Sequence, residues 1–133
     1  MTKKIFSLSL FAIVLYSLSA STYASKTLAE CEKAEESPEQ LSRCLDGVQI
    51  VLDRELQTWI NNHTFNLEEK TLSTGRYAAL KMFKRAQNDF TTFRDNNCRW
   101  QYLTISPEKG ASLAYKKCFI RVTKARIKEL SLL

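Results

Sequence analysis

Four cysteines in a chain of 133 residues restrict the possible folds more than any other feature. An even number of cysteines in a short exported chain predicts a disulfide framework, for which three pairings are possible. We expect the local pairs Cys31–Cys44 and Cys98–Cys118, because each closes a short loop between consecutive elements. A disulfide that closes a loop of this size contributes roughly 3 kcal/mol to the stability of a small domain.

The start of the chain predicts export. A short basic segment and an apolar stretch from Ile5 to Leu18 are followed by small and polar residues up to Ala24, which is the order of a secretory signal peptide. The apolar stretch is shorter than the ~20 residues that span a bilayer. We therefore predict a signal peptide over residues 1–24, a single domain over residues 25–133, and no stable membrane anchor after cleavage.

Charge is distributed unevenly along the predicted mature domain. Residues 25–69 contain 4 basic and 10 acidic residues, whereas residues 70–133 contain 14 basic and 4 acidic ones. The two halves can neutralise each other across a folded hairpin, and we favour this interpretation. The alternative is a basic surface that attracts an acidic partner.

Metal, redox and catalytic sites are not indicated. The cysteines form no Cys-x-x-Cys motif and the single histidine, His63, is distant from them in sequence, so we predict no metal site and no cofactor. His63 lies between Asn62 and Thr64, a context that favours a solvated loop residue. No glycine-rich phosphate loop and no convincing catalytic triad is present, and we predict that the protein is not an enzyme.

Start signals and apolar spacing predict helices in the first half. Residues 27–30 fit a capping box that opens a short helix, and Ser37-Pro38 begins a second one. We expect this helix to end near Asn61. Its apolar residues recur at helical spacing on one face: Leu41, Leu45, Val48, Leu52, Leu56 and Trp59. The stretch from Asn61 to Gly75 has a weaker pattern and is predicted to be a connection.

The second half is also predicted to be helical. A third helix should begin near Arg76 and end near Cys98, and Ser106-Pro107-Glu108 is a start signal for a last helix that ends near Leu130. The predicted fold is all-α: a small antiparallel bundle of three main helices plus a short N-terminal helix, held by two disulfides. Six aromatic residues on apolar helix faces are expected in the core: Trp59, Phe83, Phe90, Phe93, Tyr115 and Phe119.

The polar side of the last helix is basic. A stripe of this kind fits nucleic acid, but an exported protein rarely meets nucleic acid, so we predict no nucleic-acid partner. Anionic polymers of the cell envelope are the better match. The stripe consists of Lys116, Lys117, Arg121, Lys124 and Lys128.

Two segments are more specific than composition explains. The first reads Ala86-Gln87, Phe90, Phe93-Arg94-Asp95 and Cys98, and the second reads Cys118, Thr123, Arg126 and Leu130. Together they resemble the domain named after the lysozyme inhibitor LprI, which occurs in small exported bacterial proteins. The resemblance extends from Cys31 to Leu130. The chain departs from the family pattern at three places, with Gln57 for an asparagine, Ile60 for a tyrosine and Phe90 for a tryptophan.

The resemblance implies a helical fold, export and two disulfides. For its polar motif residues we predict a buried or half-buried network that joins two helices, rather than a binding site; these residues are Gln87, Arg94, Asp95, Thr123 and Arg126. Lysozyme inhibition is implied by analogy with the family's namesake. An inhibitor could fill an enzyme cleft with a loop, and the candidate loops are 99–109 and 61–76.

The resulting functional hypothesis is a periplasmic or secreted protein that inhibits a peptidoglycan-cleaving enzyme. The protein partner would be a lysozyme or another peptidoglycan hydrolase, including an injected hydrolase against which the chain acts as an immunity protein. The alternative hypothesis is a non-inhibitory envelope accessory protein that binds anionic polymers through the basic last helix.

Overall fold

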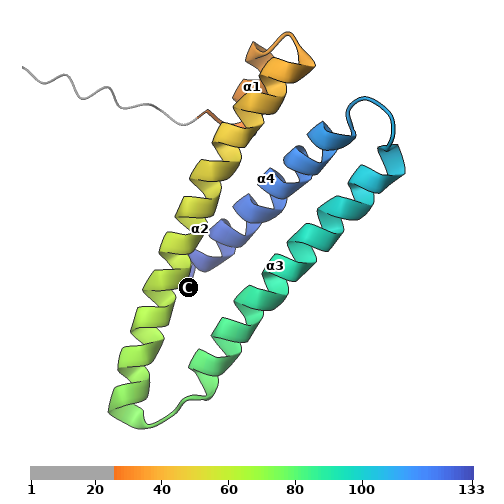
Figure 1. The fold of residues 1–133 in the computed structure, drawn as a ribbon. Coiled ribbons are helices and arrows are strands. Elements are labelled where there is room, and N and C mark those ends of the chain that lie inside the picture. Colours follow the sequence, from red (N-terminus) through yellow and green to blue (C-terminus); the bar gives the residue numbers. More distant parts are fainter. Residues whose placement is uncertain (1–25) are drawn as a thin grey trace, which may run out of the picture.

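The computed structural model describes residues 26–133, so the predicted signal peptide over residues 1–24 lies outside the described residues. Four helices and no strands form this part of the chain (Figure 1). The elements are α1 (Leu28–Ala34), α2 (Pro38–Thr74), α3 (Ala78–Ile105) and α4 (Ala111–Leu130). The prediction of an all-α fold with three main helices and a short N-terminal one is confirmed.

Helix α1 begins with the expected capping box. The hydroxyl of Thr27 accepts a hydrogen bond from the backbone N–H of Glu30, and the backbone N–H of Thr27 donates to the Glu30 carboxylate at 2.6 Å. The hydrogen bond from this backbone N–H lowers the pKa of the Glu30 carboxyl. The Cys31–Cys44 disulfide then joins α1 to α2, with the two Cα atoms 5.8 Å apart.

Helix α2 is much longer than predicted. Ser37 caps its start and Pro38 occupies the first turn as expected, but the helix continues for 37 residues to Thr74. The predicted connection between Asn61 and Gly75 is therefore wrong. No glycine or proline interrupts this stretch, and its asparagines support the helix through side-chain hydrogen bonds four residues apart, such as that from Asn66 to Asn62. Gly75 ends α2 in the left-handed conformation, with φ of 70°.

The boundaries of α3 and α4 also differ from the prediction. Helix α3 continues past Cys98 to Ile105. The prediction ended it too early because the apolar side chains of its last turns face solvent and do not follow the spacing of a buried face. The Ser106-Pro107-Glu108 signal lies in the turn between the two helices instead of opening α4. Ser106 is extended, the conformation that a following proline favours, so this pair ends α3.

Helix α4 lies between α2 and α3 (Figure 1), and it supplies five of the ten buried hydrophobic residues in the described part of the chain. One cluster combines Cys31, Leu45, Val48 and Ile120, and a second combines Leu56, Ile127 and Leu130. Because both neighbouring helices cover α4, its buried arc is wider than a single apolar face and includes Ile120 and Ile127. None of the six aromatic residues expected in the core is fully buried: five are half-buried, of which Trp59, Phe83 and Phe90 pack against the second cluster, and Phe93 is 57% exposed.

Ion pairs join the acidic first half to the basic second half. Four of them cross this boundary: Asp53–Arg94, Glu68–Lys84, Asp46–Lys116 and Glu32–Lys117. The favoured interpretation of the charge asymmetry, neutralisation within the fold, is confirmed for these positions. Between residues 26 and 133, no helix has the length and hydropathy needed to cross a membrane.

Both predicted disulfides are present, and their removal should have measurable and different effects. Replacing Cys98 and Cys118 together with Ala should lower the free energy of unfolding by about 3 kcal/mol, because the open loop gains entropy in the unfolded chain. Urea denaturation measures the difference. The matched double Ala variant at Cys31 and Cys44 should release α1 while the other three helices keep their helical circular dichroism.

Candidate functional site

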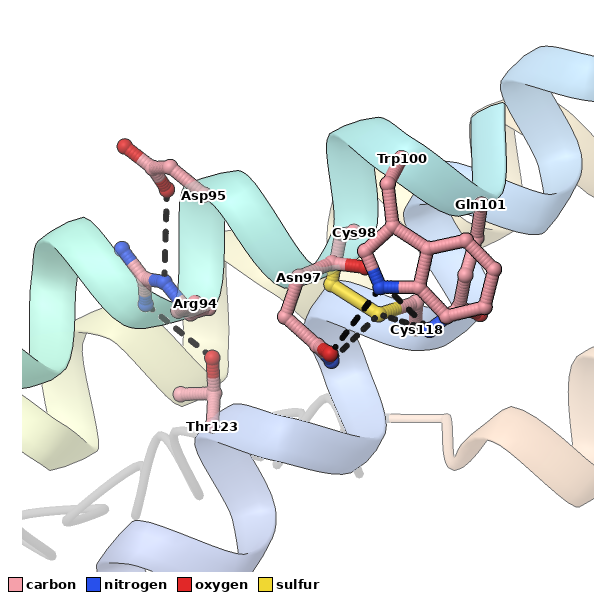
Figure 2. Close-up of a disulfide and its surroundings, with 8 residues drawn as sticks. All are labelled: Arg94, Asp95, Asn97, Cys98, Trp100, Gln101, Cys118 and Thr123. Carbon is pink, nitrogen blue, oxygen red and sulfur yellow. Dashed lines mark hydrogen bonds and ion pairs between the residues drawn. A yellow bond between two sulfur atoms is a disulfide. The ribbon is translucent and has the colours of Figure 1, made fainter. Parts of the chain in front are cut away.

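The Cys98–Cys118 disulfide ties the C-terminal third of α3 to α4, and several polar side chains surround it (Figure 2). Both cysteines are buried. The amides of Asn97 and Gln101, from the same helix as Cys98, donate to the sulfur of Cys118 at 3.7 Å and 3.3 Å. The side-chain carbonyl oxygen of Asn97 in turn accepts a hydrogen bond from the indole N–H of Trp100 at 3.3 Å. The disulfide therefore anchors a chain of contacts that reaches the surface of α3.

Arg94, one turn before the disulfide, connects three helices. Its Nη1 atom donates to the Asp53 carboxylate of α2 at 2.9 Å and to the Thr123 hydroxyl of α4 at 3.0 Å. The guanidinium carbon lies 3.7 Å from the centre of the Phe119 ring, a distance at which a cation and an aromatic face attract each other. The Nε atom is buried without a hydrogen-bond partner, and the Asp95 carboxylate lies 3.7 Å from it.

The other motif residues divide between the interior and the surface. Gln87 is buried, and its side-chain carbonyl accepts from Nε of Arg126 at 3.3 Å. Arg126 also pairs with Glu129 at 2.6 Å. Asp95 is exposed and forms an ion pair with Nε of Arg94 at 3.7 Å. The structure thus brings together Arg94 with Thr123 and Gln87 with Arg126, and places Asp95 at the edge.

His63 is not the solvated loop residue that its sequence context suggested. It lies within α2, half-buried, and its Nε2 atom is 2.8 Å from the carbonyl oxygen of Leu130. Its ring lies 6.0 Å from that of Trp59 and 5.7 Å from that of Phe83. This histidine therefore fixes the end of α4 against α2, a contact between residues too distant in sequence for the local pattern to reveal.

Beyond this contact, α2 and α3 continue without α4. We call residues 64–82 the α2–α3 arm; in Figure 1 it extends past the C-terminal end of the chain. The arm exposes four large apolar side chains, with exposed fractions between 59% and 84%: Phe65, Leu72, Tyr77 and Met82. Its turn is held by the buried Thr71, whose hydroxyl donates to the carbonyl oxygen of Arg76.

The arm is also basic at its tip. Lys70, Arg76 and Lys81 are exposed and form no ion pair with any carboxylate in residues 26–133. Of the two carboxylates on the arm, that of Glu68 pairs with Lys84 at 3.0 Å, and that of Glu69 is exposed and forms no ion pair among residues 26–133. Cations together with exposed apolar side chains are suited to a surface that binds a protein partner with acidic groups.

Part of the basic stripe of α4 is neutralised by ion pairs in the folded chain. Lys116 pairs with Asp46 and donates to Ser42, and Lys117 pairs with Glu32 at 2.7 Å. The stripe therefore loses two of its five charges to neutralisation within the fold, and the remaining three are Arg121, Lys124 and Lys128. This division weakens the hypothesis that the whole last helix binds an anionic polymer.

The fold and these contacts define a small all-α protein held by two disulfides, with no group of acidic, histidine or cysteine side chains in residues 26–133 arranged to hold a metal ion. The family described as "Lysozyme inhibitor LprI" matches residues 31–130, and the chain belongs to this family. No curated protein and no solved structure matches the chain.

The contacts of Arg94 predict a large loss of stability on its removal. Replacing Arg94 with Ala should lower the free energy of unfolding by about 3 kcal/mol, because the change removes two hydrogen bonds and the aromatic contact and leaves a cavity. Chemical denaturation measures this loss. The matched control is Arg85→Ala on the same helix, where the side chain is 74% exposed and the loss should be below about 0.5 kcal/mol. Equal losses in the two variants would contradict the central role of Arg94.

Proposed function

We propose that this protein is a non-enzymatic inhibitor of a peptidoglycan-cleaving enzyme. The observation that carries the proposal is membership of the lysozyme inhibitor family over residues 31–130, nearly the whole described chain. The helical scaffold suits this role, since two disulfides and ion pairs between the helices hold its surfaces in place.

The proposed site of action is the periplasm or the extracellular space. The two disulfides fit an oxidising compartment. The apolar segment within residues 1–24 has the features of a cleavable signal peptide, which would deliver the chain there.

The proposed inhibitory element is the α2–α3 arm, which contains most of the candidate loop 61–76. Enzymes that hydrolyse glycosidic bonds hold a pair of carboxyl groups in the cleft that receives the sugar chain. The exposed cations of the projecting arm would face these carboxyl groups, and its exposed apolar side chains would contact the walls of the cleft. The second candidate loop, 99–109, is reduced to a short turn after Ile105, because α3 continues through its first residues.

The partner class includes host lysozymes and hydrolases injected by rival bacteria. For the latter, the chain would act as an immunity protein by the same occlusion of the cleft. The different hypothesis, an envelope accessory protein, predicts salt-sensitive retention on anionic cell-wall polymer and no effect on any hydrolase. The partial neutralisation of the basic stripe favours the inhibitor.

A lysis assay tests the proposal directly: lysozyme is added to a suspension of cell walls, and the decrease in turbidity is measured over time. The mature protein in molar excess should slow the loss of turbidity, and native mass spectrometry should detect a complex with the enzyme. If lysis by lysozyme and by a panel of peptidoglycan hydrolases proceeds unchanged, the inhibitor proposal is wrong.

The arm makes a sharper prediction about which residues act. Arg76→Glu and Tyr77→Ala should each raise the concentration needed for half-inhibition roughly thirtyfold, the effect of losing a hot-spot residue worth about 2 kcal/mol. Both side chains are exposed, so helical content and thermal stability should remain near those of the wild type.

The control lies at the opposite end of α3. Lys109→Glu makes the same charge reversal in the turn before α4 and should leave inhibition unchanged. If Lys109→Glu abolishes inhibition and the arm variants do not, the inhibitory element is the α3–α4 turn.

A further inference from the structure

A shallow hollow lies on the outward side of α3, away from the α2–α3 arm. It has a volume of about 420 Å³, and its lining comes from one helix over twelve residues: Asp89, Thr92, Phe93, Asn96, Asn97 and Trp100. These positions recur at intervals of three and four, so their side chains form one stripe along the helix. The sequence pattern assigned Phe93 to the core, but the structure places it here.

The two aromatic rings of the hollow are presented to solvent. Phe93 is 57% exposed and Trp100 is 56% exposed. They are seven residues apart, which corresponds to about 10 Å along a helix. Two rings at this spacing can contact different units of an extended ligand.

The indole of Trp100 is held in place from behind. Its N–H donates to the side-chain carbonyl oxygen of Asn97. The side-chain NH2 group of Asn97 donates to the sulfur of Cys118 in the buried disulfide (Figure 2). The polar edge of the indole is therefore bound to the scaffold, while more than half of the residue's surface stays accessible. A preorganised ring loses less conformational entropy on binding than a mobile one.

The polar groups of the hollow are suited to an uncharged ligand. No lysine or arginine lines it, although the chain as a whole carries a net charge of +6. The carboxylate of Asp89 is the only charged lining group, and Arg85 lies 3.7 Å from it. The amide of Asn96 can donate and accept, and the Asp89 carboxylate accepts hydrogen bonds from hydroxyl groups. A polyanion would find no cation in the hollow.

From this combination we propose that the hollow binds an uncharged saccharide chain with N-acetyl groups, as in the glycan strand of the polymer that peptidoglycan hydrolases cleave; the choice of N-acetyl sugars rests on the proposed function. The apolar C–H faces of sugar rings contact Phe93 and Trp100, and hydroxyl and amide groups bond to Asp89 and Asn96. The inference goes beyond enzyme inhibition, since it concerns direct binding of a glycan by a surface separate from the arm. An inhibitor held in this way would be concentrated on the substrate of its target.

Titration of the mature protein with tetra-N-acetylchitotetraose, in the absence of any enzyme, tests the proposal. Isothermal calorimetry should detect binding, and Trp100→Ala and Phe93→Ala should each weaken it at least tenfold. Trp100→Phe keeps an aromatic ring and should retain part of the affinity. Met82→Ala and Leu103→Ala are matched controls, because they remove exposed apolar side chains of α3 outside the hollow and should leave binding unchanged.

Two results would overturn the saccharide site. One is the absence of binding at millimolar chitotetraose by the folded wild-type protein. The other is unchanged affinity in the Phe93 and Trp100 variants. If these variants instead lose inhibition of lysozyme without any saccharide binding, the face is a protein interface. Failure of this proposal is separate from failure of the inhibitor proposal, which the arm variants and the turbidity measurement decide.

Discussion

The rest of the fold depends on the guanidinium group of Arg94. It is the one side chain of α3 described here that bonds to both α2 and α4, through Asp53 and Thr123. The stacking of the same group on Phe119 fills space that an aliphatic side chain would otherwise occupy. Because a planar guanidinium can bond at its edge and stack on its face at once, lysine could not replace it here. The bundle is therefore closed by this polar contact in addition to its apolar clusters.

The sequence predicted the covalent and local features of the fold well. The capping box at Thr27, the start of α2 at Ser37-Pro38 and both disulfides were all confirmed, since each depends on residues close together in the chain. The face of α2 that carries Leu45, Val48 and Leu56 was also predicted correctly, because its spacing follows one simple period. Family membership followed from motif residues that pack around α3 and α4.

The errors have physical causes that lie outside local sequence. The polar stretch after Asn61 is helical because nothing in it breaks a helix, and part of it needs no apolar face where α4 has ended. His63 is half-buried owing to a contact with Leu130, 67 residues away. Phe93 follows the apolar spacing but lies on the flank of α3 that no other helix covers. Periodicity alone does not reveal whether a neighbour is present.

Both disulfides join cysteines that are consecutive along the chain. For a polypeptide that crosses a membrane from its N-terminus, Cys31 and Cys44 would emerge together well before Cys98 and Cys118. An oxidase that links each pair of thiols as it appears would therefore form the native bonds by order of arrival alone. Maturation of such a protein requires an oxidant on the far side of the membrane but has little need for a disulfide isomerase.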